Sequence, residues 1–313
     1  MTIEPTTAPA PARPEPAAGP APATAPAPRV RLSALDTLWF QVGGTVCNLA
    51  CGHCFISCSP TNHTHEMMTL AEVEPYLTDA VRLGVKEYYF TGGEPFLNPE
   101  IEAILAAALR VGPATVLTNG LLLDPARCRR LAALAAAAEH SLDLRVSLDG
   151  WDAASNDPIR GEGTFERALA GLRNLVAAGI NPVLTVTEVD GENSTDGGKE
   201  RFFELLRGLG IDKPRLKVLP LFRLGAEAER TGAYESWQRL AAEDAAAAGA
   251  QGWDHLQCSA CRMVTGRGVW VCPILVNEPA GKMGERLADA LGDYPLEHPA
   301  CWTCHVYGVS CRT

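Results

Sequence analysis

Three cysteines near the start of the sequence are spaced as ligands of a metal cluster. They occur in Cys47-Asn-Leu-Ala-Cys51-Gly-His-Cys54, a C-x3-C-x2-C spacing that directly follows an apolar run. Three thiolates on one short loop can bind three irons of a [4Fe–4S] cluster, which leaves the fourth iron open to bind another molecule. The alternative is a structural zinc site, with Cys58 as the fourth ligand. Outside such a site, Cys58 is expected to be a buried thiol.

A second group of cysteines lies near the end of the sequence. It contains two C-x2-C pairs, each followed by a further cysteine: Cys258, Cys261, Cys272, Cys301, Cys304 and Cys311. Gly266, Gly268 and the apolar run between them and Cys272 indicate a tight hairpin. Six thiolates can fill one [4Fe–4S] cluster with two left over, or serve two clusters incompletely. Paired C-x2-C units are also typical of zinc sites.

The segments between the two cysteine groups predict the scaffold that positions them. Short apolar runs, expected as strands, alternate with longer helix-like segments. The strands are expected at 37–42, 88–91, 115–118, 144–148, 183–189 and 216–222, and the helices at 70–83, 101–110, 125–138, 165–178 and 199–209. Six βα units predict an α/β fold, a partial (β/α)6 barrel of parallel strands.

Polar and glycine residues follow several of these expected strands. They are Gly92–Glu94, Asn119–Gly120 and Asp149–Gly150. Because the carboxyl ends of parallel strands meet at one edge of the sheet, these residues are expected to line a common site there.

Composition divides the chain into three parts. Residues 1–29 are mostly Pro, Ala and Thr, which predicts a disordered tail. Residues 30–225 form the expected barrel. Residues 226–313 are expected to contain a helical linker, because 226–250 is rich in Ala and Glu, and then a small Cys-rich module.

Charge and hydropathy exclude some classes of protein. The formal net charge is −10 and the Lys and Arg residues are scattered, which argues against binding nucleic acid. No apolar run approaches the ~20 residues of a membrane span. Without a recognisable export signal, the cytoplasm is the expected compartment. Thiols stay reduced there, which favours metal binding over disulfides for the eleven cysteines.

The motifs resemble, in their order, those of the radical S-adenosylmethionine (SAM) superfamily. The cysteine loop is followed by Thr91-Gly-Gly-Glu-Pro95, then Thr118-Asn-Gly120, Ser147-Leu-Asp149-Gly and the stretch 157–165. The resemblance covers roughly residues 37–225. It implies that the cluster held by Cys47, Cys51 and Cys54 reductively cleaves SAM to a 5′-deoxyadenosyl radical, which abstracts hydrogen from a substrate.

The resemblance also implies which residues bind SAM. Gly92, Gly93, Glu94 and Pro95 would hold its amino group, Ser147 its ribose and Arg160 its carboxylate. Asn119 and Asp149 would belong to the same site. His53 stands where the family often has an aromatic residue and could stack on adenine. The alternatives are an ordinary turn at 92–95, a solvated turn at Ser147 and a surface charge at Arg160. No catalytic acid or base is singled out.

The terminal cysteines resemble the auxiliary-cluster modules of the same superfamily, the SPASM and shorter twitch types. This resemblance favours one auxiliary [4Fe–4S] cluster over zinc. Two ligand sets remain open. The twitch spacing is matched by Cys261, Cys272, Cys301 and Cys304, whereas the SPASM spacing is better matched with Cys258 replacing one of them.

The sequence leaves the substrate open. A small-molecule or cofactor-pathway substrate is the first expectation, because the chain is of modest length and its auxiliary module is reduced. The alternative is a ribosomally made peptide, with a separate protein to recognise it. A third possibility is an electron carrier or zinc-stabilised protein without catalysis. An enzyme would need an electron donor such as flavodoxin or ferredoxin.

Overall fold

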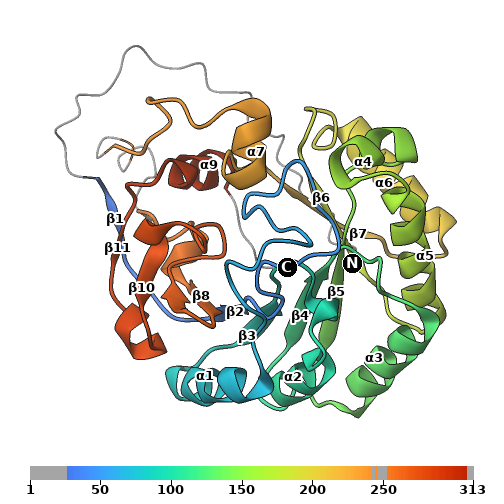
Figure 1. Ribbon diagram of the computed structural model, residues 1–313, viewed down its shortest axis with the longest axis horizontal. Coiled ribbons are helices and arrows are strands. Elements are labelled where there is room, and N and C mark those ends of the chain that lie inside the picture. Colours follow the sequence, from blue (N-terminus) through green and yellow to red (C-terminus); the bar gives the residue numbers. More distant parts are fainter. Residues whose placement is uncertain (1–26, 242–243, 245–251, 309–313) are drawn as a thin grey trace, which may run out of the picture.

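The computed structural model describes residues 27–241, 244 and 252–308, and its centre is a curved parallel sheet (Figure 1). Six adjacent strands follow one another in chain order and all run parallel. They are β2 (Thr37–Phe40), β3 (Glu87–Phe90), β4 (Ala114–Thr118), β5 (Leu142–Ser147), β6 (Val183–Thr187) and β7 (Arg215–Leu219). The expected α/β fold with six parallel strands is confirmed, each strand within a few residues of its predicted bounds.

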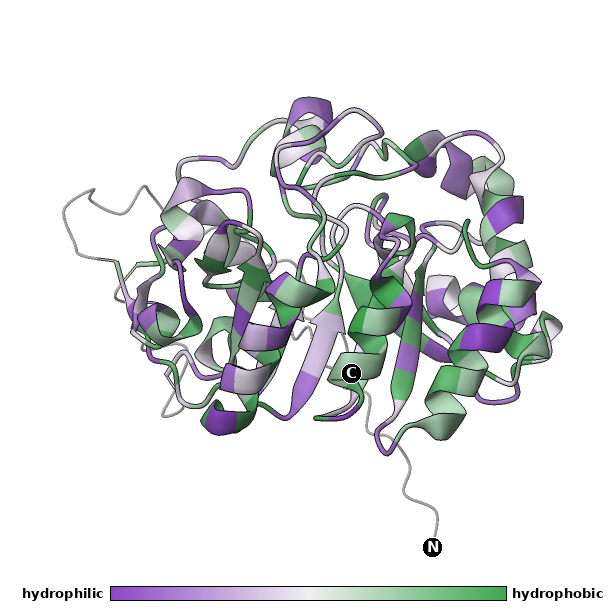
Figure 2. Ribbon diagram, turned by 60° about the horizontal axis from the view of Figure 1, so that its bottom comes forward, coloured by the Kyte–Doolittle hydropathy of each residue, from purple (hydrophilic) through white to green (hydrophobic). Residues whose placement is uncertain are grey.

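Helices connect these strands and cover the outside of the sheet (Figure 1). The five predicted helices are present as α1 (Leu70–Leu83), α2 (Ile101–Ala108), α3 (Pro125–Ala137), α5 (Thr164–Ala177) and α6 (Asp196–Gly208). Figure 2 shows hydrophobic and hydrophilic residues interspersed along these helices, and the buried hydrophobic residues of each helix belong to the cluster that packs on the sheet. At α1, Thr69 and Glu72 form a reciprocal capping box that satisfies two amide groups at the start of the helix.

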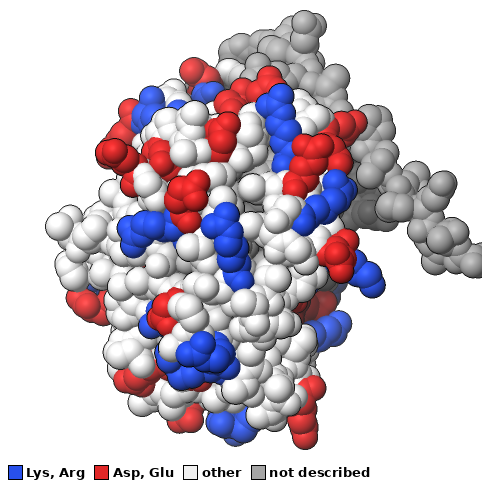
Figure 3. All heavy atoms as spheres, turned by 90° about the vertical axis from the view of Figure 1, so that its right-hand side faces the viewer, with Lys and Arg blue, Asp and Glu red and all other residues white. Residues whose placement is uncertain are grey.

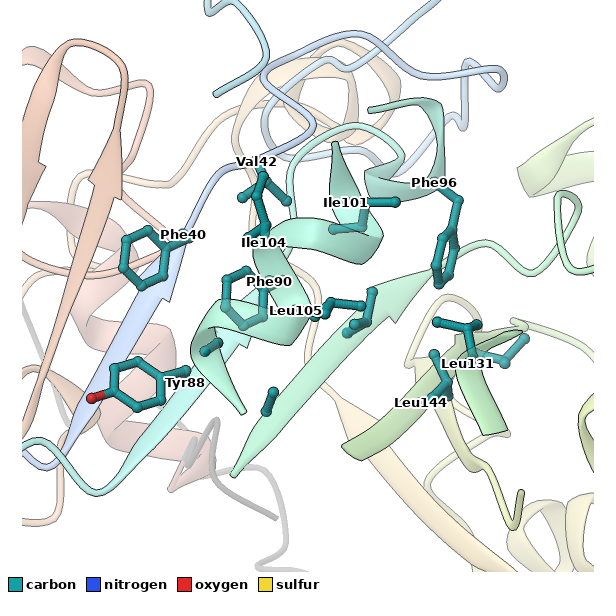
Figure 4. Packing of buried hydrophobic residues seen from close by; sticks show 14 of the residues in the cluster. Phe40, Val42, Tyr88, Phe90, Phe96, Ile101, Ile104, Leu105, Leu131 and Leu144 are labelled. Atoms are coloured by element: carbon teal, nitrogen blue, oxygen red, sulfur yellow. The ribbon is translucent and has the colours of Figure 1, made fainter. Parts of the chain in front are cut away.

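The two faces of the sheet belong to two separate hydrophobic clusters. Phe40 and Phe90 point outward and stack with ring centroids 5.5 Å apart, within the cluster that packs against the helices (Figure 4). Their chain neighbours Trp39 and Tyr89 belong to the other cluster and stack at 4.3 Å. Because successive side chains of a strand point to opposite faces, Trp39 and Tyr89 line the inside of the barrel.

Helix α4 (Ala153–Arg160) is present between β5 and α5, where the sequence predicted none. Pro158 inside it argues against a helix in the sequence. The helix forms because Asp152 and Ser155 cap its first turn reciprocally. Its last residue is Arg160, so the helix sets the position of a predicted site residue.

The C-terminal module continues the barrel sheet. The predicted hairpin is present as β8 (Cys261–Thr265) and β9 (Gly268–Trp270), and β10 (Lys282–Gly284) pairs with β9. Strand β8 also pairs parallel with β2, which joins module and barrel in one nine-stranded sheet. The module ends in α9 (Pro299–Tyr307). Short 3-10 turns lie at Pro95–Leu97, Gln257–Ser259, Pro279–Gly281 and Leu287–Ala290.

The start of the described chain lies against this module. Strand β1 (Arg29–Val30) pairs antiparallel with β11 (Tyr294–Pro295), and the Ser33 amide donates to the Ser259 carbonyl at 2.8 Å. Residues 1–26 of the predicted tail lie outside the described residues, and Arg29 already belongs to β1. The segment from β1 to Ser33 therefore packs against the C-terminal module.

The described part of the predicted helical linker is helical only near its start and at residue 244. Helix α7 (Gly225–Thr231) ends at Gly232, whose φ of 92° is a conformation that favours glycine. Residues 232–241 continue without helix, and 242–243 and 245–251 lie outside the described residues. The high helix propensity of the alanine-rich segment 226–250 therefore does not make residues 232–241 helical.

On the face shown in Figure 3, basic and acidic side chains are interspersed. This face is therefore not a continuous basic surface of the kind that binds nucleic-acid backbones. Among the helices of the described residues, none combines the length and the apolar character that crossing a bilayer requires.

Candidate functional site

The first cysteine group lies on the loop that follows β2, at the carboxyl end of the barrel strands. Backbone amides donate to two of the sulfurs: Leu49 N–H to Cys47 Sγ at 3.4 Å and Cys58 N–H to Cys54 Sγ at 3.2 Å. The Asn119 side-chain amide lies 3.7 Å from Cys47 Sγ. Such donors stabilise a negative sulfur, as the ligand of a metal requires.

The loop holds its thiols in different electrostatic environments. Burial raises the pKa of Cys47 to about 12 and that of Cys51 to about 11. A hydrogen bond from the Cys58 side chain lowers the pKa of Cys54 to about 6, and the Cys58 pKa is raised accordingly. Buried thiolates at Cys47 and Cys51 therefore need a cationic partner, which a metal cluster supplies.

The spacing of these thiols bears on the zinc alternative. Within the described residues, no three His, Cys, Asp or Glu side chains converge closely enough to hold one metal ion. Cys47, Cys51, Cys54 and Cys58 are all among the described residues.

Gly92 and Gly93 bring the turn after β3 into direct contact with the cysteine loop. A Cβ at Gly93 would lie 2.0 Å from the Val46 carbonyl oxygen, closer than atoms can approach. The amides of Gly93 and Glu94 donate to the carbonyls of Gly44 and Val46 at 2.9 and 3.0 Å. The close approach that these glycines permit is therefore one between two loops of the protein.

The Glu94 side chain is fully buried and bound to protein donors. Its carboxylate accepts from the Thr118 hydroxyl at 2.7 Å and from the amides of Phe96 and Asn119 at 3.0 and 2.8 Å. Burial raises the pKa of this carboxyl. In this structure the carboxylate connects the end of β3 to the end of β4.

Three of the predicted SAM-site residues meet at a single atom. His53 Nε2 and Arg160 Nε each lie 2.6 Å from Asp149 Oδ2, and the Thr187 amide donates to Oδ1 at 2.8 Å. Burial disfavours a charged Asp149, but the Arg160 guanidinium and the His53 imidazole hold its pKa well below the ordinary range. Arg160 is buried, so the surface-charge alternative is wrong. Ser147 is the last residue of β5, two positions before Asp149.

Two buried asparagines that the sequence did not single out hold the backbone of this cluster. Asn156 Oδ1 accepts from the Asp149 amide at 3.1 Å. Asn193 Nδ2 donates to the carbonyls of Asp149 and Thr187 at 3.0 and 2.9 Å. Asn156 directly precedes the stretch 157–165, within which Asp157 accepts the amides at the start of α5. Asn193 lies in a loop without any motif.

Four cysteines of the second group line one apolar pocket of about 350 Å³, part of it open to solvent. Cys301 and Cys304 are three residues apart on α9 and share a face of that helix. The remaining lining residues are mostly aliphatic, and the four cysteines are Cys258, Cys272, Cys301 and Cys304. Burial raises the pKa of each of the first three, that of Cys258 to about 12.

Cys261 does not line this pocket. It begins β8, and its sulfur lies 3.9 Å from the Val271 carbonyl. Cys311 lies outside the described residues. Of the two ligand sets left open by the sequence, the pocket matches the set that includes Cys258.

Direct contacts connect the two cysteine groups. The Ala226 amide at the start of α7 donates to the Cys54 carbonyl at 3.0 Å, and Asn277 of the module donates to the Ile56 carbonyl at 3.1 Å. Tyr234, just after α7, bonds the Thr303 hydroxyl on α9 at 2.9 Å. Both groups belong to the hydrophobic cluster inside the barrel and module.

The sequence pattern of the radical SAM superfamily matches residues 42–212, which is more than half of the chain. The chain therefore belongs to the radical SAM superfamily, whose members use a [4Fe–4S] cluster and SAM to catalyse radical reactions.

Two curated relatives illustrate what the chain is similar to. It is 37% identical to mycofactocin maturase MftC of Mycobacterium tuberculosis over 136 residues, 43% of this chain and 33% of the relative. It is 31% identical to GTP 3′,8-cyclase of Mycobacterium marinum over 270 residues, 82% of this chain and 67% of the relative. The chain thus spans about a third of the length of the maturase.

Solved structures support the fold. Streptococcus suis SuiB, bound to the precursor peptide SuiA, superposes with a TM-score of 0.62 over 84% of this chain and 66% of SuiB. The sequence identity is 16%, so this likeness concerns the arrangement of the chain only.

Proposed function

We propose that Cys47, Cys51 and Cys54 hold the [4Fe–4S] cluster of a radical SAM enzyme. The observation that carries this assignment is the cysteine loop itself, with amides donating to two sulfurs and three predicted SAM-site residues joined beside it. When bound, the cluster and SAM supply a 5′-deoxyadenosyl radical that removes hydrogen from the substrate. The buried walls of the site limit access of water to that reaction.

We further propose that Cys258, Cys272, Cys301 and Cys304 hold one auxiliary [4Fe–4S] cluster. Four thiols around one apolar pocket match its full ligand set. Such a site could accept an electron from the substrate radical.

For the substrate we propose a small molecule of a cofactor pathway. The relative that matches 82% of this chain is named a GTP 3′,8-cyclase. The second candidate is a peptide-derived substrate, because the relative of higher identity is named a mycofactocin maturase. Either reaction would need a one-electron donor such as flavodoxin or ferredoxin.

The two cluster assignments make separate predictions for iron. After anaerobic reconstitution, Cys51→Ala should lose formation of 5′-deoxyadenosine while retaining the iron and sulfide of the C-terminal site. Cys301→Ala should lose iron from the C-terminal site while retaining SAM cleavage. Cys128→Ala, a buried thiol on α3, is the control. Loss of all iron in Cys51→Ala would contradict the two-site assignment.

The substrate class can be tested with the wild-type protein. Small-molecule and peptide fractions of a cell extract would each be added to the reconstituted, reduced protein. The fraction that increases 5′-deoxyadenosine above the substrate-free rate contains the substrate. No 5′-deoxyadenosine under any condition, from protein with intact clusters, would contradict the enzyme assignment itself.

A further inference from the structure

The Asp149 carboxylate joins three segments that are distant in the sequence. Oδ1 accepts from the Thr187 amide, at the end of β6. Oδ2 lies 2.6 Å from His53 on the cysteine loop and 2.6 Å from Arg160 at the end of α4. The Gly52 amide, beside His53, also donates to the Ile159 carbonyl at 2.8 Å. The last turn of α4 is therefore attached to the cysteine loop at two points.

Asp149 itself is enclosed by protein. Its side chain is 0% exposed, and asparagine side chains bind both its backbone amide and its carbonyl. A buried carboxylate is stable only when its charge is compensated and its oxygens are hydrogen-bonded; Arg160 provides the opposite charge, and His53 Nε2 lies within hydrogen-bond distance. Asp149 could not turn toward a ligand without giving up these contacts, so it is an anchor and not a contact residue.

Arg160 carries donors beyond the one that contacts Asp149. Its Nε is engaged by Asp149, which leaves the two terminal nitrogens of the guanidinium. The charge of Arg160 acts on both Cys51 and Cys54, so the group lies close to the proposed cluster. A guanidinium in this place suits the carboxylate of a ligand bound at the cluster.

His53 has a second ring nitrogen, Nδ1, which Asp149 does not contact. Because Nε2 is bound to Asp149, the neutral ring presents Nδ1 as an acceptor. Nδ1 is buried and has no hydrogen-bond partner among the described residues. Buried acceptors are nearly always satisfied, so this atom indicates a donor from a molecule bound beside the loop.

We propose that Asp149 is a positioning residue that holds His53 and Arg160 as one preformed clamp for SAM. Arg160 takes the carboxylate of SAM and His53 accepts a hydrogen bond from its nucleoside part. Asp149 does not touch SAM. This inference rests on the proposed function, since it assumes that SAM binds at the loop of Cys47, Cys51 and Cys54. Fixing both side chains before SAM arrives lowers the cost of ordering them.

The test is Asp149→Asn, which keeps the shape of the side chain and removes its charge. Asp143→Asn is the matched control, because Asp143 lies on β5, the strand that leads to Asp149, and pairs with Arg215 away from the site. Each reconstituted protein would be reduced and titrated with SAM, following the change in the cluster's electron paramagnetic resonance spectrum. Iron and sulfide content would confirm that the clusters are intact.

For Asp149→Asn we expect SAM binding weaker by about tenfold or more, with wild-type iron content. The KM for SAM should rise by a similar factor and kcat should change little, because the clamp acts on binding. Asp143→Asn should bind SAM like the wild type. Unchanged affinity in Asp149→Asn with intact clusters would overturn the clamp. If the wild type shows no spectral response to SAM, the proposed function fails instead.

A second variant keeps the inference testable if Asp149→Asn does not fold. His53→Phe retains an aromatic ring that can stack on adenine but removes both ring nitrogens. The clamp predicts weaker SAM binding in this variant, because the link to Asp149 and the Nδ1 acceptor are lost. Wild-type affinity in His53→Phe would mean that stacking alone matters, and would overturn the role of His53.

Discussion

Cys47 and Cys54 both accept hydrogen bonds at sulfur, and those to Cys54 come from Cys58. The Cys58 backbone amide donates to Cys54 Sγ at 3.2 Å, and interaction with the Cys58 side chain lowers the pKa of Cys54. Hydrogen bonds to the sulfurs of a cluster stabilise its more negative, reduced form and so raise its reduction potential. Cys58 is buried, as the sequence predicted, and its backbone amide also binds the sulfur of Cys54.

We predict that Cys58→Ala lowers the midpoint potential of the first cluster. The expected shift is on the order of 59 mV, a tenfold change for one electron, because the side-chain donor is lost while the backbone donor remains. Potentiometric titration followed by electron paramagnetic resonance measures it. Cys128→Ala removes a buried thiol far from the loop and should leave the potential unchanged. A potential equal to that of the wild type in Cys58→Ala would exclude this role.

At the scale of residues, the candidate ligands were predictable from the sequence, whereas the side chains that support them were not. The spacing of Cys47, Cys51 and Cys54 suffices to suggest a candidate ligand loop, because all three cysteines lie close together on one short segment of the sequence. The contact between His53 and Asp149 was not predictable, since it depends on how β5 and the loop meet in space. Similarly, C-x2-C spacing could not show that Cys258 lines the pocket and Cys261 does not.

At the scale of elements, turns position the site as much as strands do. The turn after β3 packs so closely on the cysteine loop that Gly93 has no room for a side chain. The six strands were predictable from apolar runs, since that pattern is local. Helix α4 was not predictable, because Pro158 in its sequence argues against a helix. The capping of its first turn is seen only in the structure.

We predict that Gly93→Ala prevents normal assembly of the first cluster. A Cβ there would overlap the Val46 carbonyl, and relief requires moving the loop that carries Cys47. Iron and sulfide analysis after reconstitution should show loss of about one cluster's content, with the C-terminal site retained. The control is Gly197→Ala in α6, where nothing lies within 4 Å of the new Cβ. That change should be neutral or stabilise the protein by about 0.5–1 kcal/mol.

A wild-type iron content and SAM-cleavage rate in Gly93→Ala would contradict this prediction. It would mean that the turn can move without disturbing the loop. Loss of iron in Gly197→Ala as well would show that the readout reports general destabilisation rather than the contact between the two loops.

At the scale of the whole molecule, barrel and module are one sheet rather than two adjoining units. Strand β2 is paired on both sides, with β3 and with β8. All four of its residues are buried, and Thr37–Phe40 includes Leu38 and Phe40 at 0% exposure. The sequence predicted the hairpin of the module, but not that this hairpin completes the barrel wall, because strand pairing between distant segments leaves no local pattern.

The pairing of β2 with β8 has a consequence for solubility. A protein cut after residue 225 would lose β8 and leave β2 with a row of unpaired amides and carbonyls beside apolar side chains. Such an edge is a template for joining the same edge of another molecule. Light scattering should therefore show the isolated barrel associating with itself at concentrations where the full chain does not. The C-terminal module thus also protects the barrel from self-association.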